Sequence, residues 1–543
     1  MKKQWIDYFP TGFTPRAQQI TLISKIQAAF ESGKKFVICC APTGSGKSFI
    51  AKTLSEISKP PSSRLVDLIS DHSAFAQGFE GEYIYADECL QQPAHGAFAL
   101  TITKVLQDQY EDQFSDTAIV KGKSNYTCAV DDSFNTEVAP CVFTPLIKSD
   151  CLRHSKCPYY EARKHALLNK FSAVNYKMFF SIPEHVKKKN YVICDEASEL
   201  EDELVRQFSV SVPYERLKFA GITQHPLMTD NPDLARVWVN DLTRLVGNKI
   251  SSLTSKNKDR LHYLTSSDKH KISYLRNLHN SLKSLDKNWL TTEYIIEYTP
   301  EAASFTPLTV NRLASAIFDS AERILLMSAT IIDPANFAKT LGITDYAYIE
   351  GESVFDAKKS PIYVSTKHRI NHSNLKTILP ELATLVRQIV DHHKEDKGIV
   401  HTHTQYICDF LRAELKDDYR FLYRSSKDTN ESILNDHFAT DDPTVVVSPS
   451  MAYGVDLKDD LARFQIIVKL PYMPLNQKRI KRLFDIDREW YENKMLNTLV
   501  QAAGRATRNE NDHSVTYVLD GNIVDVVKRC KHKLPKHFLE RFA

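Results

Sequence analysis

The chain contains 543 residues, with 70 Lys and Arg against 67 Asp and Glu, which gives a formal net charge of +3. Hydrophobic residues make up 42% and charged residues 25%, which is ordinary for folded proteins and excludes wholesale disorder, a collagen-like fibre or a coiled-coil rod. At about 150 residues per domain, three or four domains are expected. No apolar run approaches the ~20 residues of a membrane span, and the N-terminus lacks a signal-peptide stretch, so we expect a cytoplasmic protein without membrane contact.

The first strong signal along the chain is an apolar run, 36–40, that enters a glycine-rich turn. The run predicts a buried parallel strand. The turn reads Ala41-Pro42-Thr43-Gly44-Ser45-Gly46-Lys47-Ser48. This pattern predicts a loop whose backbone N–H groups surround phosphate oxygens, with Lys47 on the β and γ phosphates of ATP and Ser48 on Mg²⁺. A flexible glycine loop is the alternative.

Further along, a group of cysteines is crowded into one short stretch: Cys128, Cys141, Cys151 and Cys157. Four thiolates can hold a [4Fe–4S] cluster or a tetrahedral Zn²⁺. The stretch lacks the paired Cys-x-x-Cys knuckles of common zinc sites, and a proline follows the last cysteine, so the pattern favours iron–sulfur. Zinc and unligated thiols remain open. His154 could replace one thiolate, although a solvated histidine is the simpler interpretation.

Basic and aromatic residues alternate after this point. Between Lys148 and Asn190 there are ten Lys or Arg against three Asp or Glu, with aromatic side chains between them: Tyr159, Tyr160, Phe171, Tyr176 and Phe179. Cations for phosphates and aromatic rings for bases are typical of single-strand binding. A solvated basic face is the alternative, as it is for the basic clusters at 478–482 and 528–536.

An acidic pair ends the next apolar run. Asp195 and Glu196 follow the run 191–194 and precede Ala197 and Ser198. We expect Asp195 to hold Mg²⁺ and Glu196 to orient and deprotonate the attacking water. A solvated acidic turn is the alternative when the pair is considered alone.

The region 200–305 has a different pattern. Apolar residues recur there at helical spacing in two stripes: Leu234, Val237, Trp238, Leu242 and Leu245, and Ile272, Leu275, Leu278, Leu282 and Leu285. The spacing predicts helices that pack on these faces, inserted into the first α/β domain.

The remaining strand-like runs lie at 324–327, 399–400, 445–447 and 466–468, which predicts α/β architecture with parallel sheets in two domains. Near the C-terminus, Gln501, Arg505 and Arg508 are spaced to share one helical face. Their guanidinium groups are suited to stabilise a transferring phosphoryl group. A surface helix with two arginines is the alternative.

Taken in order, these elements resemble the XPD/DinG (Rad3-like) group of iron–sulfur superfamily 2 DNA helicases, and suggest a phage or bacterial member. The resemblance rests on Arg16-x-x-Gln19, the phosphate loop, Thr103-Lys104, Asp195-Glu196-Ala197, Ser328-Ala329-Thr330, Gly454-Val455-Asp456 and the segment Gln501–Arg508. It spans nearly the whole chain.

The resemblance implies an α/β fold with two RecA-like P-loop motor domains, an inserted iron–sulfur cluster domain and an inserted helical, arch-like domain. We expect the first motor domain at 1–110, 173–199 and 306–345, and the second at 346–543. The cluster domain is expected at 111–172 and the arch-like domain at 200–305.

The resemblance also implies residue roles. Arg16 and Gln19 would lie near the adenine, Ser328-Ala329-Thr330 would couple nucleotide state to domain closure, and Asp456 would link the second motor domain to nucleotide and DNA. Residues expected to contact DNA are Thr103, Lys104, Tyr126, Tyr159 and Tyr160. Two departures from the family pattern are Ser198, where the family usually has His, and an insertion at 60–96.

The predicted function is an ATP-dependent DNA helicase that uses ATP, Mg²⁺ and a [4Fe–4S] cluster, moves 5′ to 3′ on single-stranded DNA and unwinds forked duplex. We expect a monomer that serves repair or replication, with a single-strand-binding protein or a replication or repair protein as partner. The alternative is an ATP-switched, redox-sensitive protein that clamps DNA junctions without unwinding them.

Overall fold

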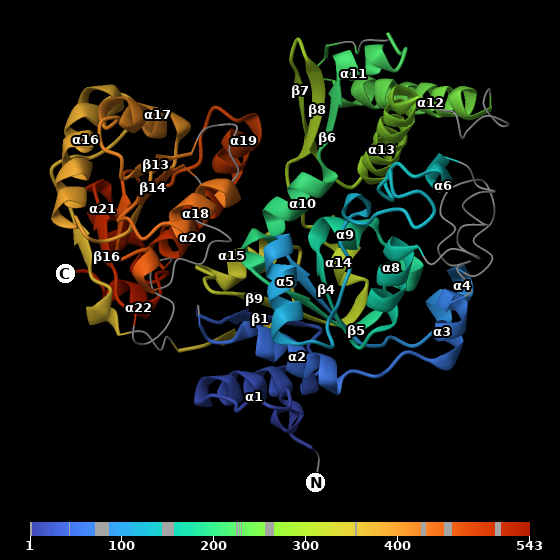
Figure 1. Ribbon diagram of the computed structural model, residues 1–543, viewed down its shortest axis with the longest axis horizontal. Coiled ribbons are helices and arrows are strands. Elements are labelled where there is room, and N and C mark those ends of the chain that lie inside the picture. The colour runs from blue at the N-terminus through green and yellow to red at the C-terminus, as the bar shows by residue number, and fades with distance from the viewer. Residues whose placement is uncertain are drawn as a thin grey trace. The chain divides into compact units, whose positions relative to one another are not determined.

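The computed structural model describes residues 3–42, 44–70, 86–143, 157–223, 226, 228–229, 231–255, 265–352, 356–424, 430–449, 459–504 and 512–543. The chain forms two compact units (Figure 1). The first comprises Met1–Cys39, Lys47–Met327 and Phe337–Ile349. The second comprises Cys40–Gly46, Ser328–Asn336 and Glu350–Ala543.

A seven-stranded sheet forms the centre of the first unit. Its order is β10 (Tyr346–Glu350), β1 (Phe36–Cys40), β9 (Ala321–Ser328), β5 (Lys189–Cys194), β2 (Ala97–Thr101), β4 (Phe171–Asn175) and β3 (Ala118–Ile119). β2 pairs in parallel with β4 and β5, β4 with β3, and β5 with β9. Their carboxyl ends therefore meet at one edge of the sheet.

Helices cover this sheet because its strands are buried on both faces, as β2 and β5 are at every position. Those in contact with it include α2 (Lys47–Ile57), α5 (Lys104–Gln113), α8 (Pro158–Leu168) and α9 (Tyr176–Ser181). The chain also forms α1 (Ala17–Glu31), α10 (Leu200–Phe208), α14 (Ser315–Phe318) and α15 (Pro334–Thr340). Three short helices lie on the connections: α3 (Ser63–Ser70), α4 (Ala86–Gln91) and α6 (Pro140–Phe143). Within the predicted insertion at 60–96, residues 71–85 are outside the described part of the chain.

The inserted region around 200–305 combines helices with a small sheet. Three strands pair antiparallel in the order β6 (Val210–Pro213), β8 (Ala302–Pro307) and β7 (Tyr294–Tyr298). Three helices accompany them: α11 (Tyr214–Phe219), α12 (Pro232–Ser255) and α13 (Ser266–Asn288). The sequence predicted helices in this region and did not predict the small sheet.

The two predicted apolar stripes in this insertion differ in outcome. The stripe on α13, from Ile272 to Leu285, is buried as predicted. The stripe on α12 is partly wrong, because Leu234 is 49% and Val237 is 58% exposed. The buried face of α12 is rotated by about one residue and consists of Ala235, Trp238, Val239, Leu242 and Val246, which pack with α13 and the small sheet.

The second unit contains a parallel six-stranded sheet. Its order is β11 (Ile362–Val364), β16 (Val515–Val518), β15 (Phe464–Ile467), β12 (Gly398–His401), β14 (Val445–Ser448) and β13 (Phe421–Tyr423). Its helices are α16 (Leu375–His392), α17 (Gln405–Glu414), α18 (Asn430–Ala439), α19 (Lys478–Ile486), α20 (Arg488–Ala503), α21 (Asn522–Cys530) and α22 (Lys536–Leu539).

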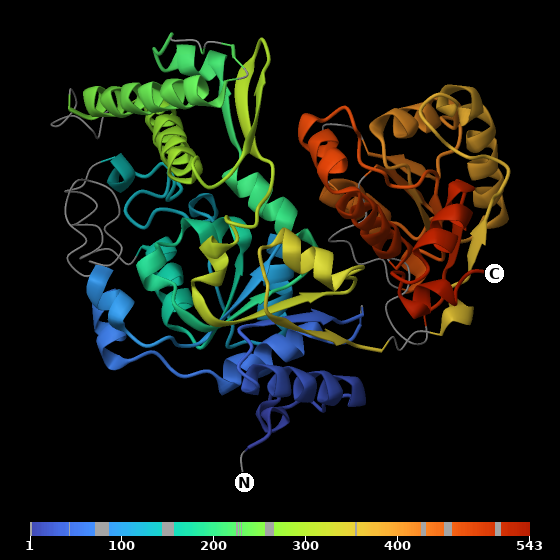
Figure 2. The same ribbon diagram turned by 180° about the vertical axis from the view of Figure 1, so that it is seen from behind.

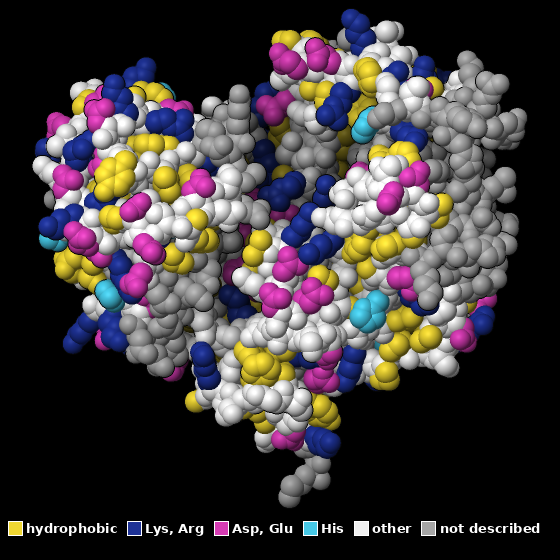
Figure 3. Space-filling view, in the orientation of Figure 1, with side chains coloured by type: hydrophobic (Ala, Val, Ile, Leu, Met, Phe, Trp, Pro, Cys, Tyr) yellow, Lys and Arg dark blue, Asp and Glu magenta, His cyan; other side chains and the backbone are white. Residues whose placement is uncertain are grey.

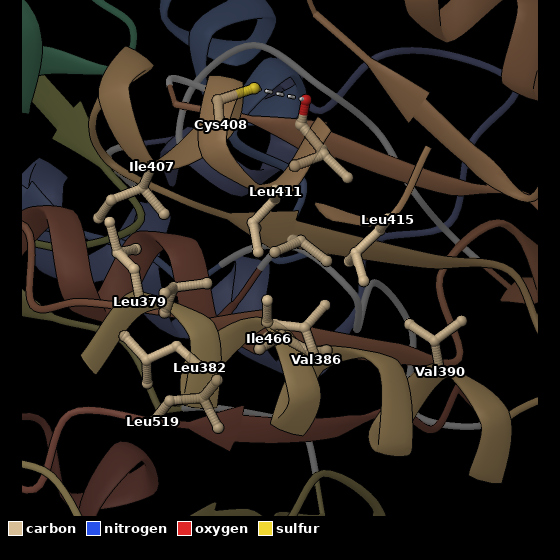
Figure 4. Close-up of a cluster of buried hydrophobic side chains, with 14 of the residues drawn as sticks. Leu379, Leu382, Val386, Val390, Ile407, Cys408, Leu411, Leu415, Ile466 and Leu519 are labelled. Carbon is tan, nitrogen blue, oxygen red and sulfur yellow. Dashed lines mark hydrogen bonds between the residues drawn. The ribbon is translucent and has the colours of Figure 1, made fainter. Parts of the chain in front are cut away.

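Amphipathic helices supply the core of this unit. Figure 4 shows Leu379, Leu382 and Val386 of α16 and Leu411 of α17 facing Ile466 of β15, and all are fully buried. Four cysteines outside the predicted cluster are also buried: Cys39, Cys40, Cys194 and Cys408. In the described part of the chain, no helix is both long and apolar enough to cross a membrane.

Candidate nucleotide site

The predicted phosphate loop joins the end of β1 to the start of α2. Gly44 (φ 77°) and Gly46 (φ 75°) have left-handed backbone conformations that L side chains rarely adopt, which explains glycine at both positions. The Ser45 N–H donates to the Pro42 carbonyl at 3.1 Å, which closes the turn. Lys47 is the first residue of α2, where backbone N–H groups favour an anion. Thr43 lies outside the described residues.

The side chains expected to meet phosphate and water lie together in the first unit. Lys47 Nζ donates to Glu196 Oε1 at 3.3 Å, and both side chains remain partly accessible. Ser48 Oγ donates to Gln113 Oε1 of α5 at 2.6 Å. The structure thus joins Lys47 to Glu196, residues that are far apart in the sequence.

Asp195 is held at the end of β5, where its backbone N–H donates to the Leu100 carbonyl of β2 at 2.9 Å. Burial raises the pKa of its carboxyl group, while the charge of Lys47 and a hydrogen bond from Tyr110 act in the opposite direction. The Tyr110 hydroxyl donates to Asp195 Oδ2 at 3.1 Å, and the Glu196 N–H donates to Oδ1 at 3.0 Å. A buried carboxylate with two donors is fixed in orientation.

Glu196 has an unusual backbone. Its φ of 51° and ψ of 48° place it in the left-handed region, which few residues other than glycine adopt. Such backbone strain is found where the surrounding structure fixes a functional side chain. Here it turns the chain directly after Asp195, just past the end of β5.

Two residues of this site were missed from the sequence. Tyr110 and Gln113 are three residues apart on α5, on the face that meets the ends of β5 and α2. Their spacing after Thr103-Lys104 was the available signal. Neither residue type is characteristic of a nucleotide site, so only the tertiary structure identifies them.

Arg16, Gln19 and the segment 328–330 were also predicted for the nucleotide site. The Arg16 N–H donates to Gln19 Oε1 at 2.9 Å, so the buried Gln19 caps the start of α1. The Ala41 N–H donates to the Ser328 carbonyl at 2.8 Å, and Cys40 Sγ donates to the Ala329 carbonyl at 3.6 Å. The predicted coupling segment at 328–330 therefore lies against the start of the phosphate loop.

In the second unit, Gln501 is buried near the end of α20. The Ala503 carbonyl at the same helix end accepts hydrogen bonds from Gln465 Nε2 at 2.7 Å and from Arg541 Nη1 at 3.0 Å. These bonds fix the helix end from which the arginine segment continues. Arg505, Arg508 and Asp456 lie outside the described residues.

The cysteine stretch is only partly described. Cys128 and Cys157 are buried and Cys141 is half-buried, whereas Cys151 and His154 fall outside the described residues. Within the described part, no three His, Cys, Asp or Glu side chains come together as a metal site.

The charges near the cysteines favour an anionic group. Burial lowers the pKa of Lys123, and the charge of Arg163 lowers it further, while Cys141 and Cys157 act to raise it. The buried guanidinium of Arg163 and the half-buried Lys123 lie near Cys141 and Cys157, and a cation near a thiol favours the thiolate form and a negatively charged cluster. These surroundings fit an iron–sulfur cluster.

The residues predicted to contact DNA differ in accessibility. Thr103 caps α5, and Lys104 Nζ donates to Asn125 Oδ1 at 2.9 Å on the exposed surface. The half-buried Tyr126 hydroxyl accepts the Lys121 N–H at 2.9 Å. Tyr159 is 3% and Tyr160 is 9% exposed, so these rings pack as core side chains and do not offer a surface for bases.

The other aromatic residues of that stretch, Phe171, Tyr176 and Phe179, are buried as well. On the face seen in Figure 3, Lys and Arg side chains gather instead around α10 and the upper end of α5, among scattered acidic side chains. In the first unit, exposed cations such as Lys104 can reach DNA phosphates, whereas the buried rings cannot stack on bases.

The chain resembles known proteins in part of its sequence and in its whole fold. Residues 399–541 match the helicase C-terminal domain family. A stretch of 116 residues is 30% identical to the ATP-dependent DNA helicase CHL1 of Candida albicans, and it covers 18% of this chain and 14% of that protein. A solved XPD helicase matches 96% of this chain and 98% of its own, with a TM-score of 0.62 and 16% identity.

The chain has the XPD helicase fold. Two further structures have the same fold. Apo XPD matches 91% of this chain and 95% of its own, with a TM-score of 0.56 and 15% identity. Xpd4 of S. tokodaii matches 95% of this chain and 98% of its own, with a TM-score of 0.53 and 13% identity. The predicted resemblance to the XPD/DinG group and the predicted fold class are confirmed. The match to the helicase C-terminal domain family, at residues 399–541, lies within the second unit.

Proposed function

We propose that this protein is an ATP-dependent DNA helicase that moves on single-stranded DNA and separates duplex strands. The observation that carries the proposal is the cluster of Lys47, Glu196, Asp195 and Tyr110 at the carboxyl edge of a parallel sheet. Ligands of such sheets bind at this edge. The helicase C-terminal domain and the XPD fold support a motor over a simple nucleotide-binding domain.

Each residue of the cluster has a role that follows from its chemistry. The N–H groups of the phosphate loop and Lys47 would hold the phosphates of ATP. Glu196, released from Lys47 as that cation turns to the γ-phosphate, would accept a proton from the attacking water. Tyr110 would hold Asp195 in place. Arg505 and Arg508 would stabilise charge on the transferring group, and Gln501 would support the same segment.

A magnesium ion fits the residues present. The buried Asp195 carboxylate has a pKa raised by burial, and a divalent cation would offset that cost. Ser48 and Asp195 would hold the ion, which would neutralise phosphate charge. Arg16 and Gln19 would contact the adenine, and Asp456 would link nucleotide and DNA in the second motor domain.

The finer features of the proposal follow the family resemblance. The motor would move 5′ to 3′ on single-stranded and forked DNA as a cytoplasmic monomer, with a single-strand-binding protein or a repair or replication protein as partner. The division into motor domains at 1–110, 173–199, 306–345 and 346–543, with inserts at 111–172 and 200–305, belongs to the same proposal. Thr103, Lys104 and Tyr126 would contact the strand.

The proposal also includes a [4Fe–4S] cluster as a cofactor, with four cysteines as its ligands: Cys128, Cys141, Cys151 and Cys157. When bound, it would tie the cysteine-bearing segments to one another. The buried Arg163 and the half-buried Lys123 near Cys141 and Cys157 support an anionic cluster. Iron and acid-labile sulfide in anaerobically purified protein test this assignment, and zinc without iron would overturn it.

The test of hydrolysis compares three variants. Lys47→Ala removes the cation for the phosphates, and Glu196→Gln removes the base while keeping the shape of the side chain. We expect both to lose DNA-stimulated ATP hydrolysis, with ATP still bound by Glu196→Gln. Glu199→Gln changes a neighbouring carboxylate and should hydrolyse ATP normally. Turnover at the wild-type rate in either of the first two variants would refute the site.

A further inference from the structure

Helix α13 of the inserted region presents one face to the cysteine-bearing segment 126–143. Lys269, Ile272 and Arg276 are spaced three and four residues apart, so they project from the same side of the helix. Figures 1 and 2 show α13 beside α6, the short helix that contains Cys141, in both views. The contacts along this face reach two separate parts of the segment.

The first contact reaches the part that carries Cys128. Lys269 is buried, and its Nζ lies 4.1 Å from the centre of the Phe134 ring. A cation over a ring at this distance is attracted to it, and more strongly when water is excluded. The Phe134 carbonyl in turn accepts the backbone N–H of Cys128 at 2.9 Å. A bridge between Thr127 and Asn135 closes the same turn.

The second contact reaches the part that carries Cys141. Ile272 is fully buried and packs against Val142, the residue after this cysteine. Arg276 Nη1 donates to the Val142 carbonyl at 2.6 Å. A hydrogen bond from a charged donor is stronger than one between neutral groups. One helix face therefore holds the backbone beside two cysteines that are 13 positions apart in the sequence (141 − 128).

We propose that α13 is a brace for the iron–sulfur cluster. Lys269 and Arg276 are positioning residues that hold the backbone segments carrying Cys128 and Cys141, respectively. The inference rests on the cluster assigned under the proposed function. A ligand set held in place by its surroundings retains its metal better than one that must be ordered on binding. Coupling of this kind is reciprocal, so the cluster would also hold α13 on the segment.

The experiment measures iron release to a ferrous chelator from anaerobically purified protein. We expect Arg276→Ala to release iron about tenfold faster than the wild type, a size typical of lost supporting contacts at metal sites. Arg276→Lys keeps a charged donor and should be intermediate. Arg236→Ala is the matched control. Arg236 of α12 forms an ion pair with Asp286 of α13 at 3.0 Å, at the end of α13 away from the cysteines.

Two further readouts separate positioning from general stability. The electron paramagnetic resonance spectrum of the reduced cluster should change in Arg276→Ala and stay unchanged in Arg236→Ala. Removing the cluster from the wild type should speed hydrogen exchange of the 269–276 amides and leave the β7–β8 hairpin unaffected. If Arg276→Ala does not fold, Arg276→Lys and Lys269→Ala decide by the same release assay.

The outcomes distinguish the two proposals. A wild type that holds iron, with equal release from Arg276→Ala, Arg276→Lys and the control, overturns the brace and leaves the cluster standing. Unchanged exchange of α13 after cluster removal also overturns the brace. A wild type without iron overturns the cluster and the brace together, while the ATP-driven motor is tested separately by Lys47 and Glu196.

Discussion

Replacement of Tyr110 by Phe tests the most specific contact of the nucleotide site. The variant keeps the buried ring and removes only the hydroxyl that donates to Asp195 Oδ2 at 3.1 Å. Burial already raises the pKa of Asp195, and the tyrosine bond is one of the interactions that lower it. We therefore expect the pKa of Asp195 to rise further in the variant, so that the carboxylate is lost at a higher pH.

The size of the effect follows from the strength of the bond. A hydrogen bond to a charged group contributes about 1.5–3 kcal/mol. One pKa unit corresponds to about 1.4 kcal/mol, so the pKa should rise by about one to two units. Because a protonated Asp195 cannot hold Mg²⁺, the acid limb of kcat/KM for Mg–ATP should move upward by about that amount, and the rates should converge at alkaline pH.

The assay is a pH profile of DNA-stimulated ATP hydrolysis at subsaturating Mg–ATP. Tyr191→Phe is the matched control, since it also removes the hydroxyl of a buried tyrosine of the first unit, one that accepts a hydrogen bond from Arg323, and it should leave the acid limb in place. A Tyr110→Phe profile that superimposes on the wild type would refute the assigned role of the Tyr110–Asp195 bond.

Replacing Arg505 or Arg508 with Lys keeps the charge but loses the planar fork of donors. The maximal rate of ATP hydrolysis should therefore fall more than ATP affinity does. Weaker affinity with an intact maximal rate would argue for a binding role instead. Cys151→Ser should lose iron and strand separation while circular dichroism shows both sheets folded, and a colourless variant that unwinds normally would contradict the cluster's role. Burial lowers the pKa of Lys189 to about 7, far below the ~10.4 of an unfolded chain. Between these values the unfolded state binds more protons, so the free energy of unfolding should rise by about 2 kcal/mol from pH 7 to 9 in urea titrations. This rise should vanish in Lys189→Met, and its persistence there would exclude Lys189 as the source.

Much of the fold was predictable because the signals are local. The apolar runs before the phosphate loop and before Asp195 form β1 and β5. Both strands are covered on both faces of the sheet, so few of their positions can be polar, and a continuous apolar run results. The small sheet of the inserted region was not predicted. Its strands β7 and β8 are half-buried and short, and two long helices dominate the pattern around them.

Prediction of the site succeeded for residues in contiguous motifs and failed for those supplied by the fold. Lys47 and Glu196 were predicted for the same active site, and they contact each other. Tyr110 was missed because a buried tyrosine on a helix is ordinary until the structure places its hydroxyl on Asp195. The rings of Tyr159 and Tyr160 illustrate the opposite case, because interleaved aromatic residues suggested a binding surface whereas the chain uses these two in its core.

The most direct test of the proposed function is strand separation of a forked DNA duplex with single-stranded tails, followed by fluorescence in the presence of ATP and Mg²⁺. We predict ATP-dependent separation by the wild-type protein and none by Glu196→Gln. Separation should be faster on a duplex with a single 5′ tail than on a duplex with a single 3′ tail. Tight ATP-dependent binding of the fork by wild-type protein without separation of its strands would contradict the helicase and favour a junction clamp.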